Sequence, residues 1–70
     1  MTRARFRFLV TREATGQMRY AAYDGERLMA SAVGDSRIEA LKALILQLRS
    51  SHAEPAAVTR AEALLETMPS

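Results

Sequence analysis

Residues 18–33 read Met-Arg-Tyr-Ala-Ala-Tyr-Asp-Gly-Glu-Arg-Leu-Met-Ala-Ser-Ala-Val, with apolar and β-prone residues on both sides of Asp24-Gly25. This dipeptide is the strongest short signal for a β-hairpin, because both central residues of a type I′ turn need a positive φ. We therefore predict one strand over 18–23 and a second over 26–33. A two-residue turn also predicts that Tyr20 faces Met29 across the hairpin.

A further strand is predicted over residues 4–11, where apolar residues and arginines alternate. The hairpin register divides the side chains of the sheet between two faces. We expect the core face to carry the larger apolar side chains: Phe6, Phe8, Val10, Met18, Tyr20, Ala22, Met29 and Val33. The outer face then carries smaller or polar residues: Arg5, Arg7, Leu9, Arg19, Ala21, Tyr23, Glu26, Leu28, Ala30 and Ala32.

Two helices are predicted after the sheet. Ser36 and Glu39 have the spacing of a capping box, and apolar residues at helical spacing follow over residues 37–49. Pro55 suits a first helical position, and it opens a second helix over about 55–67. The sequence thus predicts one α+β domain over 1–70, a three-stranded antiparallel meander followed by two helices (βββαα) in two layers.

The composition excludes several classes of chemistry. The chain has 70 residues, of which 49% are apolar and 26% charged, as in a small globular domain. It contains no cysteine, which excludes disulfides, thiolate metal sites and cysteine nucleophiles. His52 is the single histidine, so a histidine metal site or a histidine-based triad is not expected. We predict a protein that is not an enzyme, with no catalytic residues, no metal and no cofactor.

The residues around the start of the first helix are the best candidates for a chemical role. Asp35 and Glu39 are four residues apart and could act as a carboxylate pair, but acidic residues at a helix N-terminus are also favoured by the helix dipole. Gly34 could belong to an anion-binding turn, but no phosphate-binding glycine motif accompanies it. We interpret all three residues as structural.

Two surfaces of the predicted sheet suggest a binding function. Small apolar side chains on the outer face favour contact with another protein, although the second helix could cover this face or the face could simply be exposed. The candidate set for protein contact is Leu9, Ala21, Tyr23, Leu28, Ala30 and Ala32. The alternative is a basic surface for nucleic acid, for which the candidate set is Arg3, Arg5, Arg7, Arg19 and Tyr23. Single-strand binders usually present two or three stacking aromatic residues, whereas only Tyr23 is expected on this face.

The segment Gly-Asp-Ser-Arg-Ile-Glu-Ala-Leu at 34–41 resembles the element that closes the sheet of HicB-like antitoxins. In that family a strand is followed by Gly, an acidic residue, Ser or Thr, two variable residues and Glu-Ala-Leu. The resemblance covers residues 5–48, and its specific part is 34–41. It implies a strand-strand-strand-helix fold and a role in binding a partner, such as a toxin.

The sequence departs from the HicB-like pattern at two places. A tight Asp24-Gly25 hairpin replaces the family's Pro-x-Leu-Pro-Gly-Cys type segment, and residues 55–68 supply one helix where the family often adds a DNA-reading module. The order of elements is also similar to the arm-binding domains of phage integrases, whose sheet reads the DNA major groove. That likeness would use Arg5, Arg7 and Arg19.

We therefore expect a small protein-binding module, antitoxin-like or a phage-type inhibitor, that engages a toxin or a host enzyme, with nucleic-acid binding as the alternative. No apolar run approaches the ~18 residues of a membrane span and no signal-peptide pattern opens the chain, so we expect a cytoplasmic protein of bacterial or phage origin with no membrane contact.

A homodimer is expected on grounds of size, because a domain this small buries only about 60% of its unfolded surface. Its interface could use the first strand as a sheet edge. It could be completed by the patch around Leu28 and Ala30, or by an apolar stripe of the second helix: Val58, Ala61, Leu65 and Met68.

Overall fold

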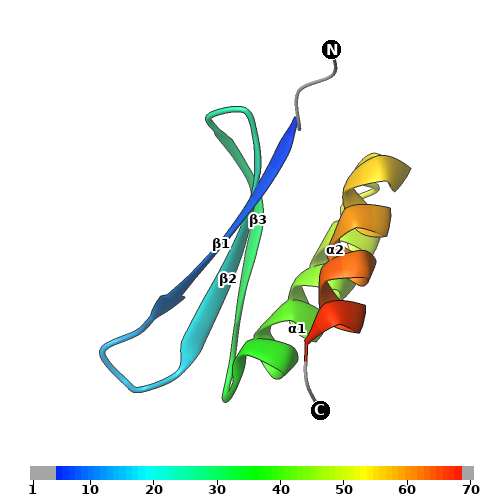
Figure 1. The fold of residues 1–70 in the computed structure, drawn as a ribbon. Coiled ribbons are helices and arrows are strands. Elements are labelled where there is room, and N and C mark those ends of the chain that lie inside the picture. The colour runs from blue at the N-terminus through cyan, green and yellow to red at the C-terminus, as the bar shows by residue number, and fades with distance from the viewer. Residues whose placement is uncertain (1–4, 69–70) are drawn as a thin grey trace.

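A computed structural model describes residues 5–68 and confirms the predicted meander followed by two helices (Figure 1). The elements are β1 (Phe6–Arg12), β2 (Met18–Asp24), β3 (Arg27–Gly34), α1 (Arg37–Ser50) and α2 (Pro55–Thr67). The strands form one antiparallel sheet in the order β1-β2-β3. Both helices lie on the same face of this sheet, so the fold has two layers.

The β2–β3 hairpin differs from the predicted register in two ways. Asp24 pairs with Arg27, so Gly25 and Glu26 are the central turn residues, and Gly25 takes the positive φ of 65°. A β-bulge then interrupts the ladder, because Tyr23 pairs with Leu28 whereas Ala22 pairs with Ala30. Met29 is the extra residue of the bulge. The predicted pairing of Tyr20 with Met29 is therefore wrong, and Tyr20 pairs with Ala32 instead.

Because the bulge adds one residue to β3, every later side chain of this strand lies on the face of the sheet opposite to the predicted one. Ala30 and Ala32 were expected on the outer face, but they pair with Ala22 and Tyr20 on the core face, and Ala32 is buried. Val33 was expected in the core, but it pairs with Arg19 on the outer face. These three placements from the sequence are wrong.

The core forms where α1 packs on β2 and β3. The largest fully buried side chains are Leu41, Leu44 and Leu48, all on α1. The sheet meets them with small residues, including Ala22, which is fully buried. Small side chains at this contact allow the helix backbone to come close to the strands.

Gly34, at the end of β3, lies against the backbone of the first turns of α1. A Cβ atom added to Gly34 would lie 2.7 Å from the carbonyl carbon of Glu39 and 2.9 Å from the Cα of Ala40. Gly34 does not have a positive φ. The glycine is required here because the backbone of α1 occupies the space of a side chain.

The two ends of α1 are capped by different means. Ser36 has extended backbone, and its side-chain oxygen accepts a hydrogen bond from the Glu39 N–H at 3.2 Å, which is one of the two bonds of the predicted capping box. At the other end, His52 takes a φ of 58°, its N–H donates to the Arg49 carbonyl, and the Ala53 N–H donates to the Leu48 carbonyl. These two bonds are those of a Schellman motif, with histidine at the position that usually holds glycine.

Helix α2 packs on α1 through Ala57 and Ala61, which are fully buried. Val58, Leu65 and Met68 are half-buried and also pack against the core. The apolar stripe proposed as a dimer surface is therefore directed largely into the molecule itself.

We predict that Gly34→Ala destabilises the fold by about 2 kcal/mol, because the new methyl group overlaps the α1 backbone and helix and sheet must separate. Chemical denaturation followed by circular dichroism measures this change. Gly16→Ala is the control, since Gly16 has a positive φ of 94° but nothing within 4 Å of an added Cβ. A smaller loss for Gly34→Ala than for Gly16→Ala would contradict the close-contact explanation.

We predict that His52→Gly stabilises the protein by about 0.5–1 kcal/mol, because glycine adopts the left-handed conformation without the steric cost of a Cβ. Thermal unfolding provides the measurement. His52→Ala separates the backbone effect from loss of the imidazole, and we expect no gain for it. An equal gain for both variants would show that the imidazole, rather than the backbone conformation, is unfavourable.

Candidate protein-binding surface

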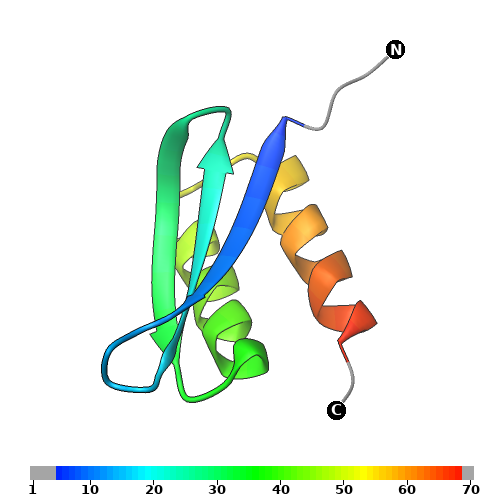
Figure 2. The ribbon, with the colours of Figure 1, turned by 60° about the vertical axis from the view of Figure 1, so that its left-hand side comes forward.

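The outer face of the sheet is open, because both helices of the described chain lie on the other face (Figure 2). Leu9 on β1 and Leu28 on β3 lie on this face with 48% and 52% of their surface exposed. Ala21 lies on β2 between the two edge strands and is buried. Leu9, Ala21 and Leu28 of the predicted protein-binding set are therefore present on one face.

Tyr23 of the predicted set is on the same face and is held by an arginine. Arg7 is its cross-strand partner, and the Arg7 guanidinium carbon lies 5.7 Å from the centre of the Tyr23 ring. Arg7 also donates a hydrogen bond from Nη2 to the Gly25 carbonyl at 3.2 Å. This arrangement fixes the ring beside Leu28 and places a positive charge at the rim of the apolar patch.

Arg19 occupies the opposite end of the face and is neutralised. Its Nη2 forms an ion pair with Oε1 of Glu13 at 3.0 Å, and its Nη1 donates to the Ser31 hydroxyl at 3.1 Å. The hydrogen bond from Arg19 lowers the pKa of the Glu13 carboxyl. The ion pair and the hydrogen bond together hold the Arg19 guanidinium beside Ser31, which the register pairs with Ala21.

The predicted nucleic-acid set is not brought together. Arg3 lies outside the described residues. Arg5 is directed to the helix side, where its guanidinium binds both carboxylate oxygens of Asp24 at 2.9 Å and both of Glu54 at 2.7 and 2.9 Å. Only Arg7, Arg19 and Tyr23 share the outer face, and Arg19 is paired there.

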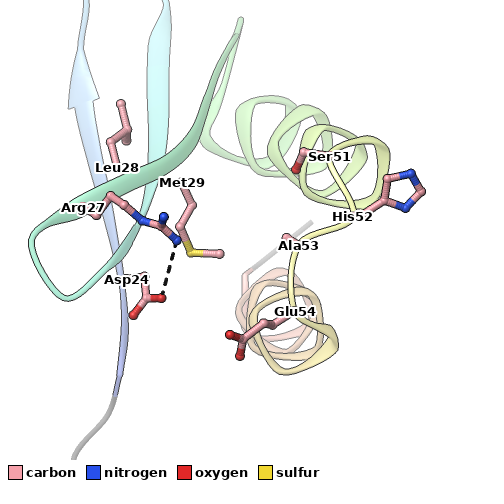
Figure 3. Close-up of a pocket in the computed structure, with 8 residues that line it drawn as sticks. All are labelled: Asp24, Arg27, Leu28, Met29, Ser51, His52, Ala53 and Glu54. Carbon is pink, nitrogen blue, oxygen red and sulfur yellow. Dashed lines mark ion pairs between the residues drawn. The ribbon is translucent and has the colours of Figure 1, made fainter.

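A cleft of about 360 Å³ lies between the hairpin and the loop that joins the helices (Figure 3). Residues 51–54 line one side, and the other side is lined by Asp24, Arg27, Leu28 and Met29. The His52 ring points away from the hairpin in Figure 3, and the Ser51 hydroxyl donates to the Leu48 carbonyl. The cleft therefore does not place a nucleophilic hydroxyl beside a histidine that could act as a general base.

The two carboxylates considered above as a possible pair, Asp35 and Glu39, do not act together in the structure. Asp35 accepts a hydrogen bond from Gln17, whereas Glu39 lies 3.8 Å from the Lys42 ammonium, so the two carboxylates have different partners. Among residues 5–68, no group of three or more histidine, cysteine or acidic residues could hold a metal ion. No helix in that range is long and apolar enough to cross a membrane.

Sequence reasoning missed Ser31 and Val33 as members of the outer face. The register pairs Ser31 with Ala21 and Val33 with Arg19. The sequence carries no local signal for this exchange, because an alternating pattern is equally regular with one residue inserted. The outer face thus consists of three cross-strand rows: Arg7, Tyr23 and Leu28; Leu9, Ala21 and Ser31; Thr11, Arg19 and Val33.

No protein-family model, curated protein or solved structure matches the chain. The residues that resemble HicB-like antitoxins have local structural roles, since Gly34 makes room for α1 and Ser36 caps it. The likeness to that family therefore stays a prediction.

We predict that the Asp24 carboxyl titrates below the ordinary aspartate range, because the Arg5 hydrogen bonds, opposed by desolvation, lower its pKa. A lowered folded-state pKa stabilises the protein fully above the unfolded value of about 4, and this stabilisation is lost as the pH falls through the folded pKa. Carbon-13 NMR titration of the carboxyl measures it. Arg5→Gln should raise the pKa of Asp24 and weaken the acid dependence of stability.

Arg19→Gln is the control for this titration. It should raise the pKa of Glu13, from which it removes the ion-pair partner, and leave the pKa of Asp24 unchanged. An Asp24 titration that is the same with and without Arg5 would contradict the ion pair.

Proposed function

We propose that this protein is a non-enzymatic binding module that engages another protein through the outer face of its sheet. The observation that carries the proposal is the pair of exposed leucines, Leu9 and Leu28, on one uncovered face. Between them lie Ala21 and Tyr23, so the centre of the face is largely apolar. Such a patch with a polar rim is typical of protein-protein contacts.

The charges at the rim indicate the chemistry of the partner. Arg7 contacts the Tyr23 ring and the Gly25 carbonyl, and no carboxylate of the described residues pairs with it. A complementary surface would place apolar side chains against Leu9 and Leu28 and a carboxylate against Arg7. An antitoxin-like protein or a phage-type inhibitor that covers a toxin or a host enzyme would use a surface of this kind.

Nucleic-acid binding is the alternative, and the stacking of Arg7 on Tyr23 is the observation in its favour. An aromatic ring beside a guanidinium can receive an unpaired base. The face offers one such ring, and two of the predicted cations, Arg5 and Arg19, already have carboxylate partners. These pairs reduce the charge available for phosphates, so we favour the protein partner.

We predict that Leu28→Asp abolishes recovery of a stoichiometric protein partner when tagged protein is purified from its native host. The charge would be desolvated in an apolar contact, at a cost of at least about tenfold in affinity. Leu46→Asp is the matched control, because 64% of the surface of Leu46 is exposed but this residue lies on α1, in the other layer. Partner capture should be unchanged by that control.

Equal loss of the partner in both variants, or in neither, would contradict the proposed surface. A gel-shift series at about 50 and 200 mM salt tests the alternative, because phosphate contacts make affinity fall steeply with salt. We expect negligible binding at both salt concentrations. Binding that falls with salt and is lost in Arg7→Gln would establish the nucleic-acid function in place of the protein-binding one.

A further inference from the structure

The two edges of the sheet are not equivalent. On β3 the bulge at Met29 interrupts the strand, and such a bulge is a common protection of an edge against pairing. On β1 all seven residues from Phe6 to Arg12 pair in register with β2, with neither a bulge nor a proline. Within the described residues β2 is the only strand beside β1. The other side of β1 is therefore a regular edge, which carries two arginines but neither a bulge nor a proline.

The direction of the backbone groups on this edge follows from one hydrogen bond. The Arg5 carbonyl accepts from the Gly25 N–H at 3.1 Å, so the backbone groups of Arg5 point toward β2. Backbone groups alternate along a strand, so those of Phe6, Phe8, Val10 and Arg12 point outward. The free edge thus presents a complete row of donors and acceptors for another strand.

The sequence of β1 suits pairing with itself. An antiparallel register that uses the whole strand places Phe6 opposite Arg12 of a second copy and Phe8 opposite Val10. Arg7 then lies opposite Thr11, so no two arginines face each other. Leu9 lies opposite its own counterpart. An aromatic–β-branched pair and a leucine pair are both favourable cross-strand contacts.

We propose that a second copy of this chain pairs with β1 in this register, about a two-fold axis that passes beside Leu9 perpendicular to the sheet. The two sheets then form one continuous sheet, with all helices on the same face. Phe8 and Val10 are only half-buried in the single chain, although they face the core, and the added strand would cover them. Figure 2 shows α2 displaced toward the free edge of β1, on the side where that strand would lie.

This pairing is independent of the proposed function, although the two share a face. It places both copies of Leu9 at the centre of the outer face of the joined sheet. Leu28 lies on β3 in each copy, at the far edge from the two-fold axis. A substitution at Leu28 should therefore leave the pairing intact, whereas a substitution at Leu9 should not.

Sedimentation equilibrium over a range of micromolar concentrations tests the proposal. We expect the wild-type protein to reach twice the monomer mass of 7.8 kDa. Leu9→Lys should raise the dimer dissociation constant at least about tenfold, because it replaces a leucine contact with two like charges directly opposite each other. Leu28→Lys, at a residue of nearly equal exposure on the same face, should leave the dissociation constant unchanged.

The register is tested separately at Thr11, which faces Arg7 of the other copy. Thr11→Glu should tighten the dimer by forming a cross-strand ion pair, and Thr11→Arg should weaken it by placing two cations together. Circular dichroism verifies that each variant remains folded. Equal effects of the two substitutions would overturn this register.

A monomeric mass at high micromolar concentration would overturn the proposal, as would a dimer that resists Leu9→Lys or dissociates with Leu28→Lys. The proposed protein-binding function can fail while this pairing holds, because Leu28 belongs to the first proposal and not to the second. Loss of the partner with Leu28→Asp and retention of the dimer with Leu28→Lys would support both.

Discussion

The close approach of α1 to the end of β3 is the constraint on which the rest of the molecule depends. Gly34 leaves no space between the strand and the helix backbone at Ala40, so the separation of the two layers is fixed there. Ala22 and Ala32 lie beneath α1, and the leucines of the helix pack against them in the core. Tyr20 is the larger side chain that the hairpin adds to this buried cluster.

The elements of the fold could be predicted from local patterns, but the faces of β3 could not. The Asp24-Gly25 hairpin, the Ser36 cap and Pro55 are signals within a few residues of the feature they specify. A bulge has no such signal, because an alternating pattern reads equally well with one residue inserted. Met29 therefore exchanges the faces of Ala30, Ala32 and Val33, although Leu28 before it is placed correctly.

The candidate site was predictable only where neighbours along a strand determine it. Leu9, Ala21 and Tyr23 lie on strands with unbroken alternation, and their common face follows from the sequence. The position of Arg5 was not predictable in the same way, because its partners are distant in sequence. Arg5 binds Glu54, forty-nine residues away, and this contact removes it from the surface that its position in the strand pattern suggested.

The pairing of charges also explains why the outer face is more apolar than the six arginines among residues 1–27 suggest. Arg5 is used to fasten β1 to the hairpin and to the start of α2, and Arg19 is held by Glu13. Exposed ion pairs of this kind add little to stability. Their main effect is to neutralise positive charge that the outer face would otherwise present. With two cations neutralised, the exposed leucines and Tyr23 dominate the centre of the face, and Arg7 marks its rim. Under the proposed function, shape and apolar contact would therefore select the partner first and a single charge second, which is the order expected for a protein surface rather than for a nucleic-acid backbone.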